Sequence, residues 1–174
     1  MIFFKIKKFF KLIHFNLKNR KLKQFTWFGH SYLDIDSEFS PSCSITVGRC
    51  GFRKNCVFRV RENASLKIGT GVAFNNNCIL TCRDRIEIGN DVIFGPNCLI
   101  FDNDHDYKSS DFKNQFTTDS IVIEDNVWIG GNCVILKGSH IGHDSVIGAG
   151  CIVKGITPPL YGCLQQTRSC LQEV

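Results

Sequence analysis

One histidine stands in a run of acidic and polar residues, Asp102-Asn103-Asp104-His105-Asp106-Tyr107. An imidazole titrates near pH 6.5, with a pKa of about 6.5, so His105 can accept a proton from a hydroxyl group at neutral pH. The neighbouring carboxylates of Asp104 and Asp106 could orient one ring nitrogen and stabilise the imidazolium. Two other interpretations stay open. One is a solvated loop histidine; the other is a metal site with both aspartates as ligands, although no second histidine lies nearby.

The ten cysteines form no CxxC pair and no Cys/His cluster with zinc spacing, and none has a histidine beside it in sequence. Several of them recur at one compact position of a repeat, where a small and partly apolar side chain fits. We therefore interpret them as reduced packing residues of a cytosolic protein and not as nucleophiles. Extracellular disulfides are the weaker interpretation, because no cleavable signal peptide is recognisable.

A six-residue period in the sequence indicates the elements that must position His105. A branched aliphatic residue recurs at every sixth position, and a compact residue follows each one four positions later: Ile123, Ile129, Ile135, Ile141, Ile147 and Val153, with Val127, Cys133, Ser139, Ser145 and Cys151. A helix has faces that recur near 3.6 residues, so it cannot use this period. Six residues can form one short strand and a sharp turn, and stacked units of this kind form a solenoid.

The same unit begins earlier, at Ile68 and Ile88, with a weaker copy at Val47. An irregular step between Leu80 and Ile88 indicates two inserted residues near 82–85. The series is broken once more, between Ile100 and Ile123, by a polar and acid-rich segment. We expect a loop over residues 102–120, and long loops on a rigid scaffold are where function concentrates.

The pattern aliphatic-Gly-x-x-small-x resembles the hexapeptide-repeat family over about Val47 to Pro159. This resemblance implies an all-β fold, a left-handed parallel β-helix of roughly five to six coils with three hexapeptides in each coil. A short N-terminal α-helical appendage is expected in addition. The expected organisation is a basic amphipathic segment over 1–28, a β-helix acyltransferase domain over 29–159 that carries the loop 102–120, and an atypical tail over 160–174.

The stretch from "IGNDVIFGPNCLIFDNDHDY" to "VWIGGNCVILKGSHIGHDSVIGAGCIVKG" is similar to the galactoside, maltose and polysaccharide O-acetyltransferases of that family. In those enzymes a loop histidine at the position of His105 is the general base that takes the proton from an acceptor hydroxyl. The hydroxyl then attacks the thioester of acetyl-CoA. The resemblance thus implies acetyl-CoA as donor substrate, no metal, and a sugar as acceptor. The basic and apolar N-terminus favours a lipid-linked glycan as that acceptor.

The resemblance also implies roles for other residues. Asn77 joins His105 in the catalytic set, although the Asn75–Asn77 run could equally be turn-forming asparagines at a corner of a coil. Acceptor-binding positions are Asn75, Asp104, Asp106 and Tyr107, and positions along the donor are Trp128, Gly131, Ala149 and Lys154. His140 and His143 occupy outward repeat positions, and we interpret them as surface residues.

Charge is distributed unevenly along the chain, whose formal net charge is +5. Residues 1–25 carry eight basic residues and no acidic one, interleaved with Phe and Ile, whereas the rest has thirteen basic and sixteen acidic residues. A nucleic-acid-binding body is therefore not expected. The N-terminal segment favours peripheral contact with an anionic membrane, at the inner face of the cytoplasmic membrane. The alternative is a helix packed on its own domain.

The expected function is acetyl-CoA-dependent O-acetylation of a sugar hydroxyl in surface polysaccharide or lipopolysaccharide synthesis, by a homotrimer. Two alternatives remain. The ending after Ile156 lacks the segment usual in the family, which leaves a non-catalytic scaffold or an inactive remnant open. A γ-carbonic-anhydrase-like hydratase would need three histidines converging on zinc, and only His105 is suitably placed.

Overall fold

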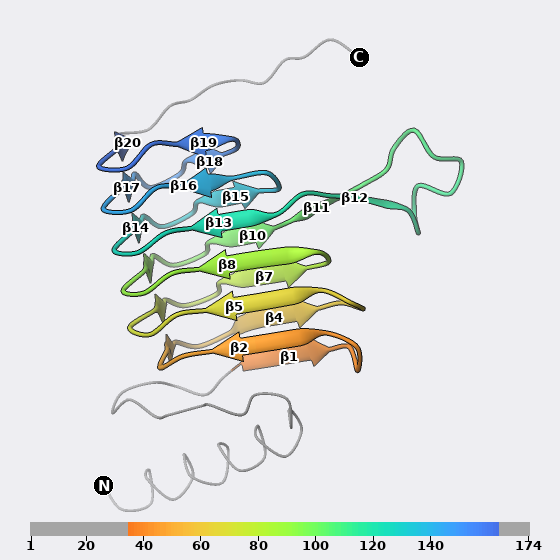
Figure 1. The fold of residues 1–174 in the computed structure, drawn as a ribbon, viewed down its shortest axis with the longest axis horizontal. Helices are drawn as coiled ribbons and strands as arrows, with labels where there is room; N and C mark the ends of the chain where they lie inside the picture. Colours follow the sequence, from red (N-terminus) through yellow and green to blue (C-terminus); the bar gives the residue numbers. More distant parts are fainter. Residues whose placement is uncertain (1–34, 164–174) are drawn as a thin grey trace, which may run out of the picture.

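The computed structural model describes residues 35–163, and these form a solenoid of six coils with three parallel sheets (Figure 1). Each coil contributes one strand to each sheet, so that sequence neighbours lie in different sheets and residues about 20 positions apart lie side by side. We call the sheets A, B and C. The A–B, B–C and C–A edges are the lines of corners that join them.

The strands stack in register from coil to coil. Sheet A contains β1 (Ile35–Phe39), β4 (Cys56–Val60), β7 (Ile79–Cys82), β10 (Leu99–Phe101), β15 (Val134–Leu136) and β18 (Ile152–Val153). Sheet B contains β2 (Ser44–Val47), β5 (Ser65–Ile68), β8 (Arg85–Ile88), β13 (Ile121–Ile123), β16 (His140–Ile141) and β19 (Ile156–Thr157). Sheet C contains β3 (Gly51–Phe52), β6 (Ala73–Phe74), β9 (Ile93–Phe94), β14 (Trp128–Ile129), β17 (Val146–Ile147) and β20 (Gly162–Cys163).

The core runs along the axis of the solenoid and is built from the residues of the six-residue period. The series from Ile123 to Val153 is buried, as are the compact residues that follow each member at the corners. In the earlier coils phenylalanines replace the isoleucines of sheet C. Phe74 stacks on Phe52 and Phe94 with ring centroids 5.4 and 4.5 Å apart, within the range of favourable aromatic packing.

Asparagine and aspartate shape the corners, because they tolerate the left-handed backbone conformation better than other residues with a side chain. At the C–A edge the side-chain amides of four such residues form a continuous ladder: Asn55 to Asn77 (3.1 Å), Asn77 to Asn97 (2.9 Å) and Asn97 to Asn132 (3.0 Å). All four have φ between 58° and 62°.

The coils approach each other closely where glycine stands at the C–A edge. A Cβ atom on Gly95 would lie 2.4 Å from the backbone nitrogen of Gly131, and one on Gly130 would lie 2.5 Å from that of Ala149. Both distances are shorter than any real contact allows, so a side chain at either position would push the coils apart.

The eight cysteines from Cys43 to Cys151 are free and buried, as expected of packing residues. Burial raises the pKa of the Cys50 thiol to about 12 and raises that of Cys82 further. A thiol protonated at neutral pH is a poor nucleophile. Cys50 and Cys82 are therefore protonated packing residues of the core.

The loop expected over 102–120 contains a β-hairpin. It contains β11 (Asn103–His105) and β12 (Phe116–Thr118), which pair antiparallel and project from the A–B edge between β10 and β13 (Figure 1). The sequence obscures these strands because both are short and polar. Two strands that face solvent on both sides lack the apolar alternation by which strands are recognised.

The expected parallel β-helix of six-residue repeats is confirmed. It has six coils, within the expected range of five to six. β20 pairs with β17, so the last coil extends to Cys163, into the segment that the sequence assigns to the tail. The N-terminal helix expected over 1–28 lies outside the described residues. Within residues 35–163 no helix has the length and apolar character needed to cross a membrane.

Candidate active site

The hairpin that carries His105 is held to the solenoid by a buried carboxylate. Asp102 follows β10 and is fully buried. Its oxygens accept hydrogen bonds from the backbone N–H groups of Arg83 (2.8 and 3.0 Å) and Asp84 (2.8 Å), and from the amide of Asn103 (2.9 Å). Charge-assisted bonds of this kind are the strong ones. Arg83 and Asp84 form the corner at which the six-residue series is irregular. This corner therefore supplies the backbone N–H groups that bind Asp102.

His105 lies at the end of β11, exposed to solvent, with one ring nitrogen fixed. Its Nδ1 atom lies 2.8 Å from the backbone carbonyl oxygen of Phe112 in the turn of the hairpin. Its ring packs against Phe116, the residue opposite it in β12, with centroids 4.4 Å apart. A carbonyl oxygen can only accept, so in the neutral ring Nδ1 carries the proton and Nε2 keeps a free lone pair.

Phe116 also contacts a cation. The guanidinium carbon of Arg83 lies 3.3 Å from the centroid of the Phe116 ring, the arrangement of a cation–π contact. Phe116 therefore touches both His105 and Arg83 and connects the hairpin to the third coil. Neither Phe116 nor Arg83 was singled out by the sequence analysis. The irregular step near 82–85 is the one signal that pointed to Arg83.

The acidic neighbours of His105 hold the hairpin and do not reach the imidazole. Asp104 pairs with Lys137 of the next coil, with Nζ and Oδ2 3.4 Å apart, and the same Nζ bonds to the Thr117 hydroxyl. The Asp106 carboxylate accepts a hydrogen bond from the backbone N–H of Lys108 (3.2 Å), which orders the turn of the hairpin. Tyr107 is 76% exposed. The group that orients the imidazole is thus the Phe112 carbonyl and not a carboxylate.

Asn75 and Asn77 lie at the C–A edge, between β6 and β7, and so on a different edge from His105. Both halves of the Asn77 amide are engaged in the asparagine ladder, and the Asn75 oxygen accepts the backbone N–H of Asn76 (2.8 Å). These contacts agree with a turn-forming role, and one chain does not bring either residue next to His105.

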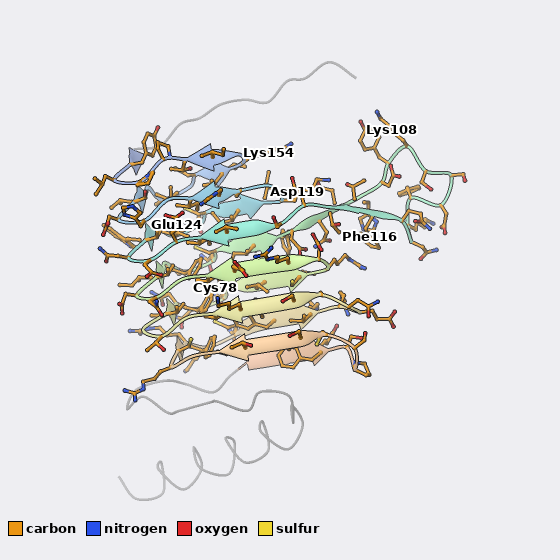
Figure 2. All side chains as sticks on the ribbon, in the orientation of Figure 1. Cys78, Lys108, Phe116, Asp119, Glu124 and Lys154 are labelled. Atoms are coloured by element: carbon orange, nitrogen blue, oxygen red, sulfur yellow. The ribbon has the colours of Figure 1, made fainter. Side chains whose placement is uncertain are left out.

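The predicted donor residues divide between the edges in the same way. Gly131 and Ala149 lie at the C–A edge, and Trp128 lies on the outer face of sheet C, 55% exposed between Ile93 and Val146. Lys154 is exposed on the last A–B corner. Figure 2 shows Lys154 and the hairpin residues Phe116 and Lys108 on one side of the solenoid, with Glu124 on the opposite side.

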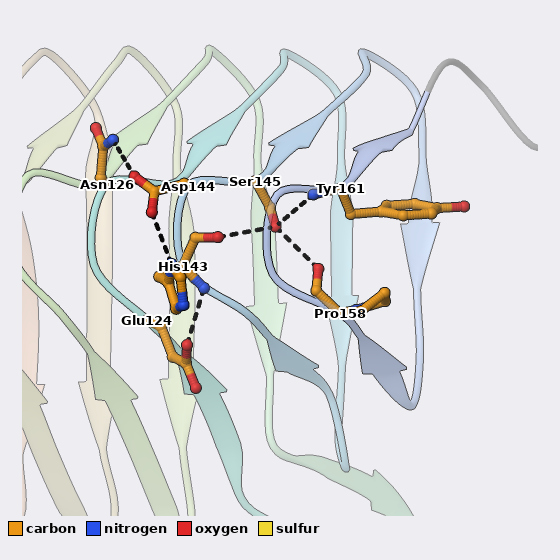
Figure 3. A network of polar contacts seen from close by, with 7 residues as sticks. All are labelled: Glu124, Asn126, His143, Asp144, Ser145, Pro158 and Tyr161. Carbon is orange, nitrogen blue, oxygen red and sulfur yellow. Dashed lines mark hydrogen bonds and ion pairs between the residues drawn. The ribbon is translucent and has the colours of Figure 1, made fainter.

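A separate polar network occupies the B–C edge (Figure 3). His143 Nδ1 lies 2.6 Å from Asp144, which also accepts the amide of Asn126 (2.5 Å), and Glu124 bonds to His140 Nε2 and to the backbone N–H of His143, both at 2.8 Å. The bond to Asp144 raises the pKa of His143. Glu124, Asn126, His143 and Asp144 border an open depression of about 480 Å³. Both histidines are exposed, as predicted, and nothing connects them to His105.

Among residues 35–163 no group of three or more His, Cys, Asp or Glu side chains is arranged to hold a metal ion. The described histidines lie on two different edges of the solenoid. The geometry of His105, with a carbonyl on one nitrogen and a free lone pair on the other, suits a base that acts on an external proton.

Comparison with known proteins agrees with the repeat. Residues 120–155 match the family model described as bacterial transferase hexapeptide (six repeats). A galactoside O-acetyltransferase of Lactococcus lactis is 38% identical over 91 residues, covering 51% of this chain and 44% of that protein. A putative lipopolysaccharide biosynthesis O-acetyl transferase of Escherichia coli is 26% identical over 144 residues, covering 69% and 74%. The chain spans less than half the length of the galactoside O-acetyltransferases that it matches.

The fold has solved counterparts as well. A hexapeptide-repeat containing acetyltransferase of Vibrio cholerae, solved in complex with acetyl coenzyme A, superposes with a TM-score of 0.53 at 28% identity, covering 86% of this chain and 69% of that one. The resemblance inferred from the sequence is therefore confirmed: the chain is a hexapeptide-repeat β-solenoid that resembles the hexapeptide-repeat acetyltransferases in sequence and in fold.

Proposed function

We propose that this protein transfers an acetyl group from acetyl-CoA to a hydroxyl group of a sugar, with His105 as the general base. The observation that carries the proposal is the 2.8 Å contact between His105 Nδ1 and the Phe112 carbonyl, which leaves Nε2 free to accept a proton. Named O-acetyltransferases among its relatives, and the acetyl-CoA bound to the Vibrio cholerae protein, support the donor and the reaction.

The reaction needs only one proton acceptor from the protein. Nε2 of His105 takes the proton of the acceptor hydroxyl while its oxygen attacks the thioester carbonyl carbon of acetyl-CoA. The tetrahedral intermediate collapses by breaking the carbon–sulfur bond. The departing thiolate takes the proton from the imidazolium, which leaves an acetyl ester, free CoA and neutral His105.

A homotrimer would unite the two separated groups of site residues. The outer face of sheet A carries an apolar stripe that runs through five coils: Val57, Ile79, Leu99, Val134 and Ile152. Sheet A separates the two groups of site residues. The A–B edge carries His105 and Lys154, and the C–A edge carries Asn77, Gly131 and Ala149. Three copies packed through sheet A around a threefold axis would place the A–B edge of each copy against the C–A edge of the next.

The acceptor and the cellular site are proposed from the sequence. Residues 1–25, with eight basic residues among Phe and Ile, would attach a cytoplasmic enzyme to the inner face of the cytoplasmic membrane, where a lipid-linked glycan can be presented. Surface polysaccharide or lipopolysaccharide synthesis would use such an acceptor, and one relative is named for the latter. Co-sedimentation with anionic vesicles that is abolished by deleting residues 1–25 would support this location.

The function is tested by two measurements on the full chain. Calorimetric titration should show saturable binding of acetyl-CoA, and mass spectrometry should show acetyl esters on members of a glycan panel. A non-catalytic scaffold would give neither result. Binding of acetyl-CoA without transfer to any acceptor would instead identify an inactive remnant.

A further inference from the structure

Two arginines stack on the A–B edge directly below the hairpin. The backbone N–H of Arg61 donates to the carbonyl of Cys82 (2.9 Å), which places Arg61 one coil below Arg83 in the continuing ladder. The Nε atoms of both side chains are buried and have no hydrogen-bond partner among the described residues. Buried donors are normally paired, so these two leave the guanidinium groups incompletely satisfied. Since no solvent reaches Nε, an oxyanion from outside would bond to the terminal Nη groups.

The two positive charges of Arg61 and Arg83 are opposed by too few carboxylates. Arg61 forms one ion pair, with Glu38 at 3.0 Å, and Arg83 forms none with any residue between 35 and 163. Asp102 already binds the backbone at the hairpin base. Burial, and then the charge of Arg61, lower the pKa of Arg83 by more than Asp102 raises it. An added oxyanion would relieve this imbalance.

The position of the pair relative to His105 indicates what the oxyanion belongs to. The proposed donor residues Gly131, Ala149 and Lys154 belong to the coils after the hairpin, whereas Arg61 and Arg83 belong to the coils before it. If acetyl-CoA occupies the later coils, the acceptor must approach His105 from the earlier ones. An acceptor bound there would lie over the two arginines.

We propose that Arg83, supported by Arg61, binds an oxyanion of the acceptor, so that the preferred acceptor is an acidic sugar that carries a phosphate or a carboxylate. This inference rests on the proposed function and specifies its substrate class. A guanidinium presents several N–H donors in one plane, which suits phosphate and carboxylate oxygens. Because Phe116 touches both Arg83 and His105, an oxyanion held by Arg83 would keep the sugar ring beside the base.

Binding is tested first, without any transfer. The Nε–H signals of the arginines in the full chain are followed by NMR during titration with glucose 1-phosphate, glucuronate and glucose. The two anions should shift the Arg83 signal saturably, and glucose should not. Arg61→Gln should weaken both anions about tenfold. Arg85→Gln should have no effect, because that guanidinium is paired with Glu87 (2.9 Å) on sheet B. Shifts that do not saturate, or equal weakening by both variants, would overturn the proposal.

Transfer from acetyl-CoA is measured next on acidic and neutral sugars. Arg83→Gln should lower kcat/KM for acidic acceptors about 10- to 100-fold and for neutral ones less than threefold, and Arg83→Lys should restore part of the loss. Equal losses on both classes would show that Arg83 only positions the hairpin. If no sugar is acetylated but the saturable anion shift persists, the proposed function fails and the anion site stands. If neutral sugars are acetylated and Arg83→Gln changes no rate, the anion site fails alone.

Discussion

At the scale of single residues, the role of His105 depends on which of its ring nitrogens is free. Since the Phe112 carbonyl holds Nδ1 and leaves Nε2 free, His105→Ala should remove the proposed acceptor of the substrate proton. We expect kcat to fall roughly 10²- to 10⁴-fold, the usual contribution of a general base, with unchanged acetyl-CoA affinity and melting temperature. Steady-state kinetics measures kcat, and calorimetry measures the acetyl-CoA affinity and the melting temperature. A loss of only a few-fold would show that another group is the base.

Asn77 and Asn97 offer a matched pair, because both stand in the amide ladder with φ near 60°. Replacing either by alanine removes ladder bonds and puts a less tolerant residue in the left-handed region, which should cost about 1–2 kcal/mol of stability in each case. If Asn77 also contacts the acceptor, Asn77→Ala alone should reduce transfer. Equal activities of the two folded variants would leave Asn77 a purely structural residue.

At the scale of elements, the hairpin depends on Asp102. Asp102→Asn replaces an acceptor-only group by one that turns N–H atoms toward the backbone N–H groups of Arg83 and Asp84. Leaving one of these buried donors unsatisfied should cost about 1–3 kcal/mol. Thermal unfolding should show the loss, and hydrogen exchange should accelerate in residues 103–118. Asp111→Asn, an exposed change in the turn of the same hairpin, is the control and should alter neither.

The B–C edge gives a pH dependence of known sign. Hydrogen bonding to Asp144 raises the pKa of His143 above 6.5, and bonds from Asn126 and then His143 lower the pKa of Asp144 below 3.8. The stability from charging His143 is therefore fully present below pH 6.5 and is lost as pH rises through the raised value. NMR titration should find the His143 pKa lower in Asp144→Asn. An unchanged pKa would contradict the assignment.

At the scale of the whole molecule, assembly should depend on one face of the prism. Leu99→Glu places a charge in the middle of the sheet A stripe, whereas Val122→Glu places one on the outer face of sheet B in the same coil. We expect light scattering to show a trimer for the native chain and for Val122→Glu, and a monomer with little activity for Leu99→Glu. A native monomer would refute both the trimer and the composite site.

The repeat could be read from the sequence because the solenoid is nearly one-dimensional. Each inward residue packs within its own coil and against the coils directly above and below, so the period from Ile123 to Val153 defines the core without knowledge of more distant contacts. The loop that carries His105 is visible in the same way, because it interrupts a regular coil, whereas the role of His105 as base is implied by the resemblance and stays a prediction. The buried cysteines and exposed His140 and His143 follow from their positions in the repeat.

Other features required the tertiary structure. The hairpin over 103–118, the Asp102 anchor and the contact of Phe116 with Arg83 join segments that the period does not relate. The carbonyl that fixes the His105 tautomer comes from Phe112, a residue type that gives no hint of such a role. The sequence also did not show that the width of sheet A separates His105 from Asn77 and Gly131. A period fixes how far a residue lies along the axis, but the edge on which it lies depends on where each corner turns.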